Sequence, residues 1–384
     1  LEKIDKLSEQ KELQFINHKV AETLDGEGVD VKIIIFEGDK VIVEKINIAG
    51  NTVTNDSVIR GELLVDEGDP FSELLINKSV NRIKSRNLFG SVNVKTRTGS
   101  SEDLKILEIS VEEKATGEIM AGAGVGTDGT SFQVSVSENN WLGKGINLES
   151  LANISEERVS GNLNVTNPNY NSSGNAVSAG INLSSADNTA TSGYKTSSTG
   201  FSLGTSFEQY ENIFFSPGIS IESEKIEAQD SASANIKKMD GNYFNADLTY
   251  GIALDKRDQS FQPTEGFVVR FDQSLPIIQD SSSIFNGISY KGYNELSEDL
   301  IGSLKFGAKT IHGIDDDVRL TERLFMPRSS LRGFALGKVG PKDGVDWVGG
   351  NYLTSIGAEA KLPNLLPESY RTDFNLFLDT ANLW

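Results

Sequence analysis

Residues 118–143 read EIMAGAGVGTDGTSFQVSVSENNWLG, and the glycines of GVGTDG (residues 124–129) have the spacing of a dinucleotide-binding turn. Such a turn binds pyrophosphate only where a strand leads into a helix, because the helix N-terminus supplies the amide groups. After Gly129, however, Phe132, Val134 and Val136 alternate with polar residues at the period of a strand. Two strands joined by an Asp-Gly turn predict a β-hairpin rather than a nucleotide site.

Composition argues against several classes of function. The 384 residues carry a formal net charge of -19, which disfavours nucleic acid as a partner. The chain has no cysteine, which excludes thiolate metal sites and suits an oxidising compartment. Its two histidines, His18 and His312, lie in different regions, which disfavours a zinc site or a histidine-based triad. We therefore expect no enzyme activity, no cofactor and no metal site.

The N-terminal part of the chain has the pattern of a small α+β domain over residues 41–115. A strand, VIVEKINIAG, precedes two helices for which Thr54 and Ser72 are the expected N-caps, and two further strands follow, SVNVKTRT and LKILEISVEE. Residues 1–40 have the pattern of the last helix and last strand of a preceding copy of this unit. Because Leu1 is neither an initiator methionine nor the start of a signal peptide, we expect a piece of a longer precursor.

Residues 116–384 alternate apolar and polar positions over segments such as TGFSLGTSFEQY and GFVVRFDQSL, and about thirteen such strands follow one another. A transmembrane β-strand needs roughly 9–11 residues with this alternation. Trp141, Tyr170 and Tyr210 lie near predicted strand ends. A soluble β-sandwich alternates similarly, but the number and length of the strands favour a transmembrane antiparallel β-barrel. Because such barrels normally close with an even number of strands, we expect the sheet to be incomplete at Trp384.

One connection, residues 313–349, interrupts the run of strands and contains RLFMPRSSLRGFALGKVGP. Loops of this length are usually functional or disordered. The stretch SLRGFALGKVGP resembles the signature of the sixth extracellular loop in the BamA family of outer-membrane β-barrel assembly proteins. The similarity extends to the 41–114 unit, which resembles the membrane-proximal POTRA domain, to the NWLGKG turn and to the LDKRDQSFQPTEG hairpin. The order of motifs and domains also agrees with this family.

The resemblance implies a mainly β fold with about thirteen of sixteen barrel strands, the barrel in the bacterial outer membrane and the POTRA region in the periplasm. It implies folding and insertion of unfolded outer-membrane proteins, with accessory lipoproteins, periplasmic chaperones and outer-membrane lipid as further partners. A two-partner secretion pore shares POTRA units and a similar loop, and it remains the alternative. A plain diffusion porin would need neither the N-terminal domain nor the long inward loop.

The first predicted barrel strand carries Gly122, Gly124 and Gly126 on one face. Each glycine in a strand costs about 0.5–1 kcal/mol relative to alanine and leaves little to pack across the sheet. In proteins similar to this one, the seam between first and last strands opens and an incoming strand adds there, so we interpret the glycines as part of a weak lateral seam. Relief of crowding inside a tapered barrel is the other interpretation.

Arg332, Gly333 and Phe334 form the centre of the loop motif. An arginine folded into the barrel would need acidic partners, and strand alternation directs Glu359 and Asp379 inward. An exposed loop arginine is the alternative. In the small domain, Glu67 matches an acidic position that contacts a lipoprotein partner in relatives, and it is our candidate docking residue.

Overall fold

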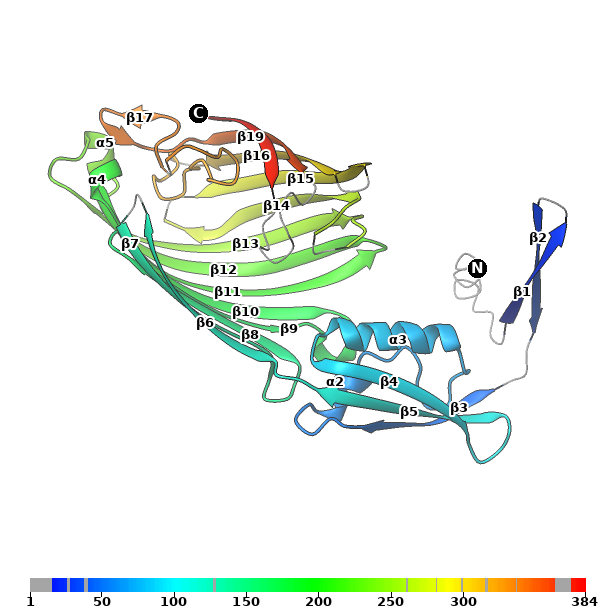
Figure 1. The fold of residues 1–384 in the computed structure, drawn as a ribbon. Helices are drawn as coiled ribbons and strands as arrows, with labels where there is room; N and C mark the ends of the chain where they lie inside the picture. Colours follow the sequence, from blue (N-terminus) through cyan, green and yellow to red (C-terminus); the bar gives the residue numbers. More distant parts are fainter. Residues whose placement is uncertain are drawn as a thin grey trace. The chain divides into compact units, whose positions relative to one another are not determined.

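The computed structural model describes residues 16–25, 28–37, 41–126, 129–259, 262–280, 282–297, 300–314, 317–335, 337–362 and 374–384. The chain divides into two compact units. Unit 1 comprises residues 1–118 together with the short segments 138–147 and 171–173, and unit 2 holds most of the large sheet (Figure 1).

Unit 1 contains the predicted α+β domain, with its elements in the predicted order. They are β3 (Ile42–Ala49), α2 (Asp56–Arg60), α3 (Glu73–Ser85), β4 (Phe89–Thr98) and β5 (Leu104–Glu113). The sheet has the order β3-β5-β4, in which β3 runs parallel to β5 and β4 antiparallel to it. Helix α3 lies along one face of this sheet (Figure 1).

The core of this domain follows from the helical spacing of apolar residues in α3. Ile76 and Ile83 are buried and belong to one cluster with Ile46 and Leu107 of the sheet. Burying such a side chain contributes about 1.5–3 kcal/mol. The predicted N-cap of α3 is confirmed, since Ser72 accepts a hydrogen bond from the Leu75 amide at 3.4 Å.

The predicted N-cap of α2 is wrong. Asn55 occupies the cap position, and its side chain makes no capping hydrogen bond. The Thr54 hydroxyl instead accepts a hydrogen bond from Asn140 Nδ2 at 2.9 Å, in the segment 138–147 of the same unit. The Thr54 hydroxyl therefore binds a residue far away in sequence and not the first turn of α2, as the local pattern had predicted.

Glu113, at the end of β5, binds the turn that precedes α2. Its carboxylate accepts hydrogen bonds from the hydroxyl of Thr52 at 2.6 Å and from the amides of Val53 at 2.9 Å and Thr54 at 2.6 Å. Desolvation raises the pKa of Glu113, but these hydrogen bonds outweigh it and lower the pKa to about 2. The carboxylate thus fixes the turn that leads into α2.

Upstream, β1 (Ile16–Asp25) and β2 (Gly28–Glu37) form an antiparallel hairpin. Strand β2 contains the predicted strand of residues 1–40, whereas the predicted helix falls in residues 1–15, outside the described part of the chain. The assignment of residues 1–40 to a preceding POTRA copy stays a prediction.

The large sheet has thirteen strands, the predicted number, and each neighbours the next in chain order. Its strands are β6 (Gly117–Gly126), β7 (Gly129–Trp141), β8 (Ile146–Ser155), β9 (Arg158–Asn167), β10 (Ala176–Asn188), β11 (Tyr194–Tyr210), β12 (Ile213–Ala228), β13 (Gly241–Asp255), β14 (Gly266–Gln279), β15 (Ser283–Ser297), β16 (Leu300–Gly313), β19 (Tyr352–Lys361) and β20 (Asn375–Leu383). The predicted β6–β7 hairpin is confirmed, and a strand, not a helix, follows the glycine-rich stretch.

Small elements lie in the connections of this sheet. They are η1 (Tyr170–Ser172), α4 (Thr189–Ser192), α5 (Ala234–Lys237), β17 (Lys342–Asp343) and β18 (Asp346–Trp347). None of the helices in the described ranges is long and apolar enough to span a bilayer.

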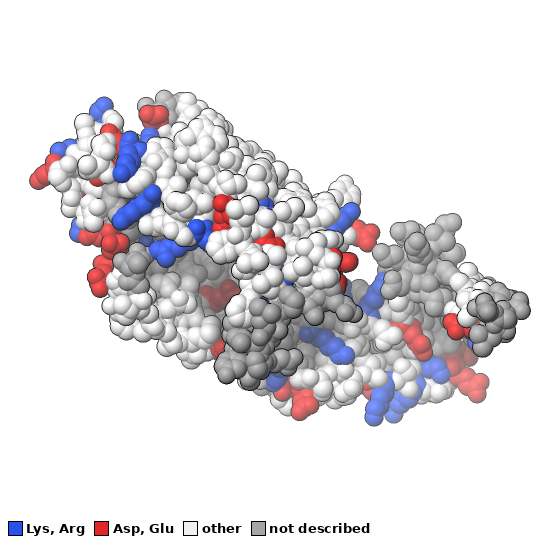
Figure 2. Space-filling model, turned by 45° about the horizontal axis from the view of Figure 1, so that its top comes forward, with Lys and Arg blue, Asp and Glu red and all other residues white. Residues whose placement is uncertain are grey.

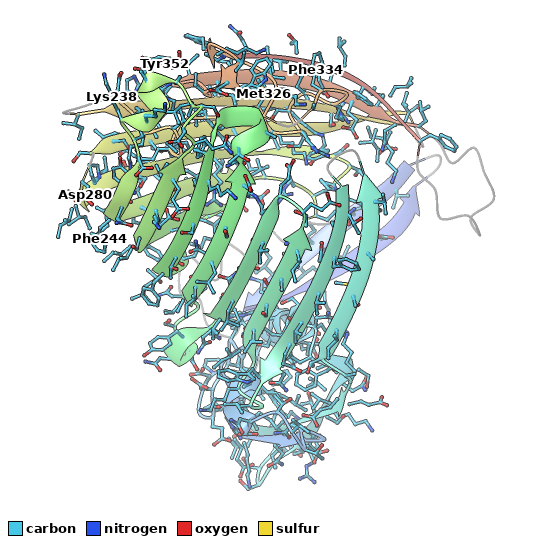
Figure 3. All side chains as sticks on the ribbon, turned by 90° about the vertical axis from the view of Figure 1, so that its left-hand side faces the viewer. Lys238, Phe244, Asp280, Met326, Phe334 and Tyr352 are labelled. Carbon is cyan, nitrogen blue, oxygen red and sulfur yellow. The ribbon has the colours of Figure 1, made fainter. Side chains whose placement is uncertain are left out.

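The large sheet is curved (Figures 1 and 3), and alternation along its strands gives it an apolar outer face. Phe201 of β11 is 45% exposed and pairs with exposed isoleucines on both sides, Ile181 of β10 and Ile221 of β12. Figure 2 shows a broad uncharged area of surface with charged side chains mostly at its margins. Trp141 and Tyr210 end β7 and β11 and are exposed, as expected for residues at a membrane interface.

We predict that Glu113→Gln destabilises the domain of residues 41–114 by about 2 kcal/mol at pH 7, a loss comparable to that of a helix cap. Because the folded-state pKa is depressed, this contribution is complete above about pH 5 and disappears as the pH falls toward 2. Urea unfolding of the domain at several pH values measures it, with the neighbouring exposed Glu112→Gln as control. Equal losses for the two variants at pH 7 would refute the proposed role of Glu113 in fixing this turn.

Candidate functional site

The long connection between β16 and β19 packs against the end of the sheet. Val318, Leu324 and Met326 of the connection are buried in one apolar cluster with Leu353 of β19 and Leu383 of β20. Leu324 also exchanges backbone hydrogen bonds with Gly350, at 2.8 and 2.9 Å. Figure 3 shows Met326 and Phe334 of the connection beside the last strands. The loop is therefore a packed structural element.

Arg332 forms the charged anchor of this loop. Its Nε and Nη2 donate to Oδ2 and Oδ1 of Asp379 at 2.7 and 2.8 Å, a bidentate pair, and its backbone amide donates to Oδ2 at 3.2 Å. Nη1 donates to Oε2 of Glu359 at 3.1 Å. The guanidinium also lies 3.7 Å from the centre of the Phe377 ring. All three sequence-predicted charged residues thus meet at one point.

The burial of these groups makes the pairing necessary. The side chain of Asp379 is only 5% exposed, against 20% for Glu359 and 28% for Arg332. A carboxylate so far removed from water is costly unless it is paired and hydrogen-bonded. Asp379 should therefore dominate the energy of the anchor.

Lys305 of β16 joins Arg332, Glu359 and Asp379, and we call these four residues the Arg332 cluster. Lys305 was not predicted from the sequence. Its Nζ lies 2.9 Å from Oε2 of Glu359, so two cations face two carboxylates. The strand register places Lys305 beside Gly357, and Gly357 beside Asp379. Alternation in GSLKFGAKTI does direct Lys305 inward, because Leu304 and Phe306 on either side of it are exposed on the outer face.

Two glycines support this arrangement, one through its backbone conformation and one through the space it leaves. Gly333, directly after Arg332, has φ of +88°, a conformation that side chains disfavour. At Gly357, an added Cβ would lie 3.1 Å from Asp379 Oδ1 and would press on the carboxylate. Phe334, the third residue of the motif, is 59% exposed and makes no comparable anchor within the described loop.

The candidate seam residues lie on β6, at one end of the strand order, far in that order from β19 and β20. A Cβ added at Gly122 would meet no atom within 4 Å, and one at Gly124 would lie 3.4 Å from Ser131 Oγ. Gly126 ends the strand, and its surroundings are not described. Crowding within the described sheet therefore does not require glycine at position 122.

Glu67 of the small domain is half exposed. Its Oε1 accepts the Ile46 amide at 3.0 Å and lies 3.8 Å from Arg60 Nη1. The carboxylate is thus held at the surface of the domain, and its role in docking a partner stays a prediction.

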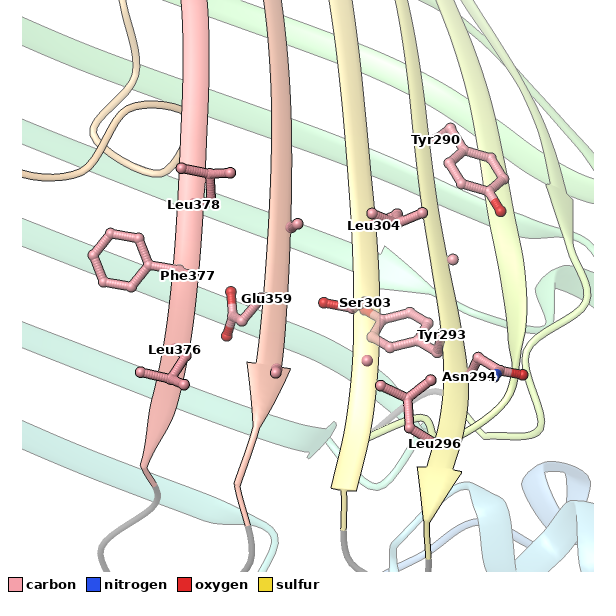
Figure 4. Close-up of a pocket in the computed structure, with 14 residues that line it drawn as sticks. Tyr290, Tyr293, Asn294, Leu296, Ser303, Leu304, Glu359, Leu376, Phe377 and Leu378 are labelled. Carbon is pink, nitrogen blue, oxygen red and sulfur yellow. The ribbon is translucent and has the colours of Figure 1, made fainter.

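The outer face of the last strands holds a depression of about 560 Å³ (Figure 4). Small residues form its floor, and larger side chains such as Tyr290, Leu304 and Leu378 stand around it. The small residues are Gly292, Gly302, Ala358 and Ala360. Within the described ranges, no three histidine, aspartate or glutamate side chains converge as a metal site requires.

Comparison with known protein families shows to which family this chain belongs. Residues 140–384 match the family model of the Omp85 superfamily domain, and residues 41–114 match the POTRA model, described as a surface antigen variable number repeat. The chain belongs to the Omp85 superfamily. Its C-terminal match covers most of the large sheet that carries the Arg332 cluster.

Relatives and solved structures agree with this membership. The outer membrane protein assembly factor BamA of Neorickettsia risticii is 27% identical over 364 residues, 92% of this chain and 49% of the relative. BamA of Neisseria meningitidis is 24% identical over 93% of this chain and 48% of the relative. The chain thus spans about half the length of these Omp85 relatives.

Solved structures share this fold. BamA from Haemophilus ducreyi lacking POTRA domains 1–3 superposes with a TM-score of 0.74 and 22% identity, over 100% of this chain and 81% of that one. CdiB from Acinetobacter baumannii superposes with a TM-score of 0.57 and 12% identity, over 98% and 69%.

We predict that Asp379 stabilises the closed loop more than Glu359 does. Asp379→Asn should lower the free energy of opening the loop by about 3 kcal/mol, because a bidentate, buried pair is broken. Glu359→Gln should cost about 1 kcal/mol, because it makes a single contact to Arg332 and is more exposed. Native-state hydrogen exchange over residues 324–335 measures both.

Asp272→Asn is the matched control, since Asp272 pairs with Arg270 on an exposed surface and should cost at most about 1 kcal/mol. Equal effects of Asp379→Asn and Asp272→Asn would show that Arg332 is not an anchor.

Proposed function

We propose that the full-length protein folds unfolded β-barrel proteins and inserts them into the bacterial outer membrane. The Omp85 barrel lies in that membrane and the POTRA region in the periplasm. The observation that carries the proposal is the edge of β6, where the face of Gly122 and Gly124 has almost nothing to pack. A strand of this kind pairs weakly and parts easily from a neighbour.

An incoming unfolded strand would add to the exposed backbone of β6 by β-augmentation. Main-chain hydrogen bonds then supply the affinity, so many different sequences can be accepted. The reaction needs no nucleotide, cofactor or chemical catalysis, because a closed barrel satisfies its own backbone in the bilayer. Throughout this exchange the Arg332 cluster keeps the long loop fixed to β19 and β20 on another part of the sheet.

The POTRA domain would receive substrates and partners on its periplasmic surface. Its strand β4 is an edge of the sheet β3-β5-β4, whereas the start of β3 is covered by residues 69–71 through backbone hydrogen bonds. Nascent strands or chaperone-delivered chains would pair with the β4 edge. Glu67 is the candidate contact for an accessory lipoprotein.

Outer-membrane lipid is the remaining partner. The depression over β15, β16, β19 and β20 lies among exposed leucines of the outer face, and a lipid tail would fill it. Because small residues lie between larger side chains here, the lipid-facing surface of these strands is uneven.

A two-partner secretion pore is the second candidate function, because such pores share POTRA units and a similar long loop. Such a pore would release its substrate across the membrane, whereas an assembly factor leaves it folded within the membrane. The two functions are separated by the fate of the substrate in proteoliposomes, as a protease-resistant membrane barrel or as a free chain on the far side.

We predict that Gly122→Val and Gly124→Val together slow insertion of a substrate barrel into liposomes by about tenfold, because added side chains strengthen pairing of β6. The space around Gly122 indicates that the variant folds. Gly161→Val on β9, where a Cβ would also meet only ordinary contact, is the matched control. Unchanged insertion by a folded double variant would remove these glycines from the mechanism.

A further inference from the structure

The turn of residues 319–323, which we call the first arm of the long connection, carries a second arginine, Arg319. Its side chain is 3% exposed, so it is buried more deeply than the 28% exposed side chain of Arg332. The backbone carbonyl of Arg319 accepts the amides of Glu322 at 3.0 Å and Arg323 at 3.1 Å, which closes a tight turn. A buried cation in a turn of a long loop requires an explanation, because its desolvation is costly.

The guanidinium of Arg319 is held by the inner face of β13. It lies 4.4 Å from the centre of the Tyr243 ring and donates from Nη2 to Oε1 of Glu322. The same Glu322 oxygen accepts a hydrogen bond from Asn245 Nδ2 at 3.3 Å. Tyr243 and Asn245 lie two residues apart on β13 and therefore share one face of the strand.

Residues on either side of Arg319 in this turn add contacts to β12 and its neighbours. Thr321 donates to Oε2 of Glu224 at 2.7 Å, and Glu224 is the cross-strand partner of Tyr243. Leu320 is buried in an apolar cluster with Tyr194, Ile226, Ala232, Ile236 and Val348. The turn is thus joined to the wall by a stacked cation, hydrogen bonds and an apolar side chain.

This attachment is separate from the Arg332 cluster. Arg332 binds β19 and β20, whereas the Arg319 turn binds β12 and β13, and three strands, β14, β15 and β16, lie between the two pairs in the sheet. Val318 and Leu324, which flank the turn, pack with Leu353 and Leu383 of β19 and β20. Within the described residues no hydrogen bond or ion pair joins the two arginine groups, so the turn itself, residues 319–323, can be tested separately from Arg332.

We propose that Arg319 is a second positioning residue, which fastens the first arm of the loop to β12–β13 independently of Arg332. The importance of a loop fixed at two places rests on the proposed assembly function. Four buried atoms where the turn meets β13 have no partner among the described residues: Nε and Nη1 of Arg319, Oε2 of Glu322 and Oδ1 of Asn245. Equal numbers of donors and acceptors in one buried cluster fit bridging by ordered water.

Hydrogen exchange of the full-length protein in nanodiscs tests this proposal. Arg319→Met should accelerate exchange over residues 319–323 at least about tenfold and leave residues 329–335 within about twofold, because only the turn around Arg319 is released. Arg332→Ala should give the reverse pattern. Lys338→Met, which removes an exposed charge from the same loop, should change neither arm.

Two further variants keep the test decisive if Arg319→Met folds poorly. Tyr243→Leu removes the stacked ring but keeps the ion pair, and it should accelerate exchange in the first arm alone. Adding Glu322→Gln to Arg319→Met should restore part of the protection, since no uncompensated carboxylate is left buried. Unchanged exchange over residues 319–323 in Arg319→Met and Tyr243→Leu, or equal acceleration over residues 319–323 and 329–335, would overturn the proposal.

The substrate-insertion rate of the same variants separates this proposal from the proposed function. Release of the first arm together with slower insertion supports both. Release without any change in insertion supports the second anchor and removes the fixed loop from the assembly mechanism.

Discussion

The bidentate pair between Arg332 and Asp379 is the constraint on which the organisation of β19, β20 and the long connection depends. A carboxylate that is 5% exposed cannot remain charged in the barrel wall without a cation, and Lys305 pairs with Glu359 instead. The cation must therefore come from the loop. This requirement brings the loop to the inner face of β20, after which Met326 and Leu324 bury apolar surface against Leu353 and Leu383.

Stability is distributed unevenly over the described sheet. Around β12, β13, β19 and β20 the wall is joined to the long connection by ion pairs and two apolar clusters. At β6, by contrast, a Cβ added at Gly122 would meet no atom within 4 Å, and one at Gly124 would meet only Ser131 Oγ at 3.4 Å. A protein that accepts a new strand at one edge needs such a contrast, because the rest of the wall must hold its shape while that edge exchanges partners.

Periodicity was enough to predict the fold class, the thirteen strands and the inward direction of Glu359 and Asp379, because strand alternation fixes a face without knowledge of neighbours. Periodicity could not predict contacts that depend on strand register. Lys305 meets Glu359 only because β16 and β19 pair as they do. Thr54 was assigned as a helix cap, whereas its hydroxyl serves Asn140, 86 residues further along the chain. Arg319 gave no local signal, because its partners lie on strands β12 and β13.

The distance between the loop and the wall tests the central claim, that Arg332 fixes the loop inside the barrel. Residues 1–384 contain no cysteine, so spin labels at Phe334→Cys and Thr380→Cys are unique in this part of the protein. Pulsed electron paramagnetic resonance of the full-length protein should give a single narrow distance distribution, unchanged while a substrate inserts and broadened by Asp379→Asn. A broad distribution in the otherwise unaltered protein, or one that Asp379→Asn leaves narrow, would contradict this account.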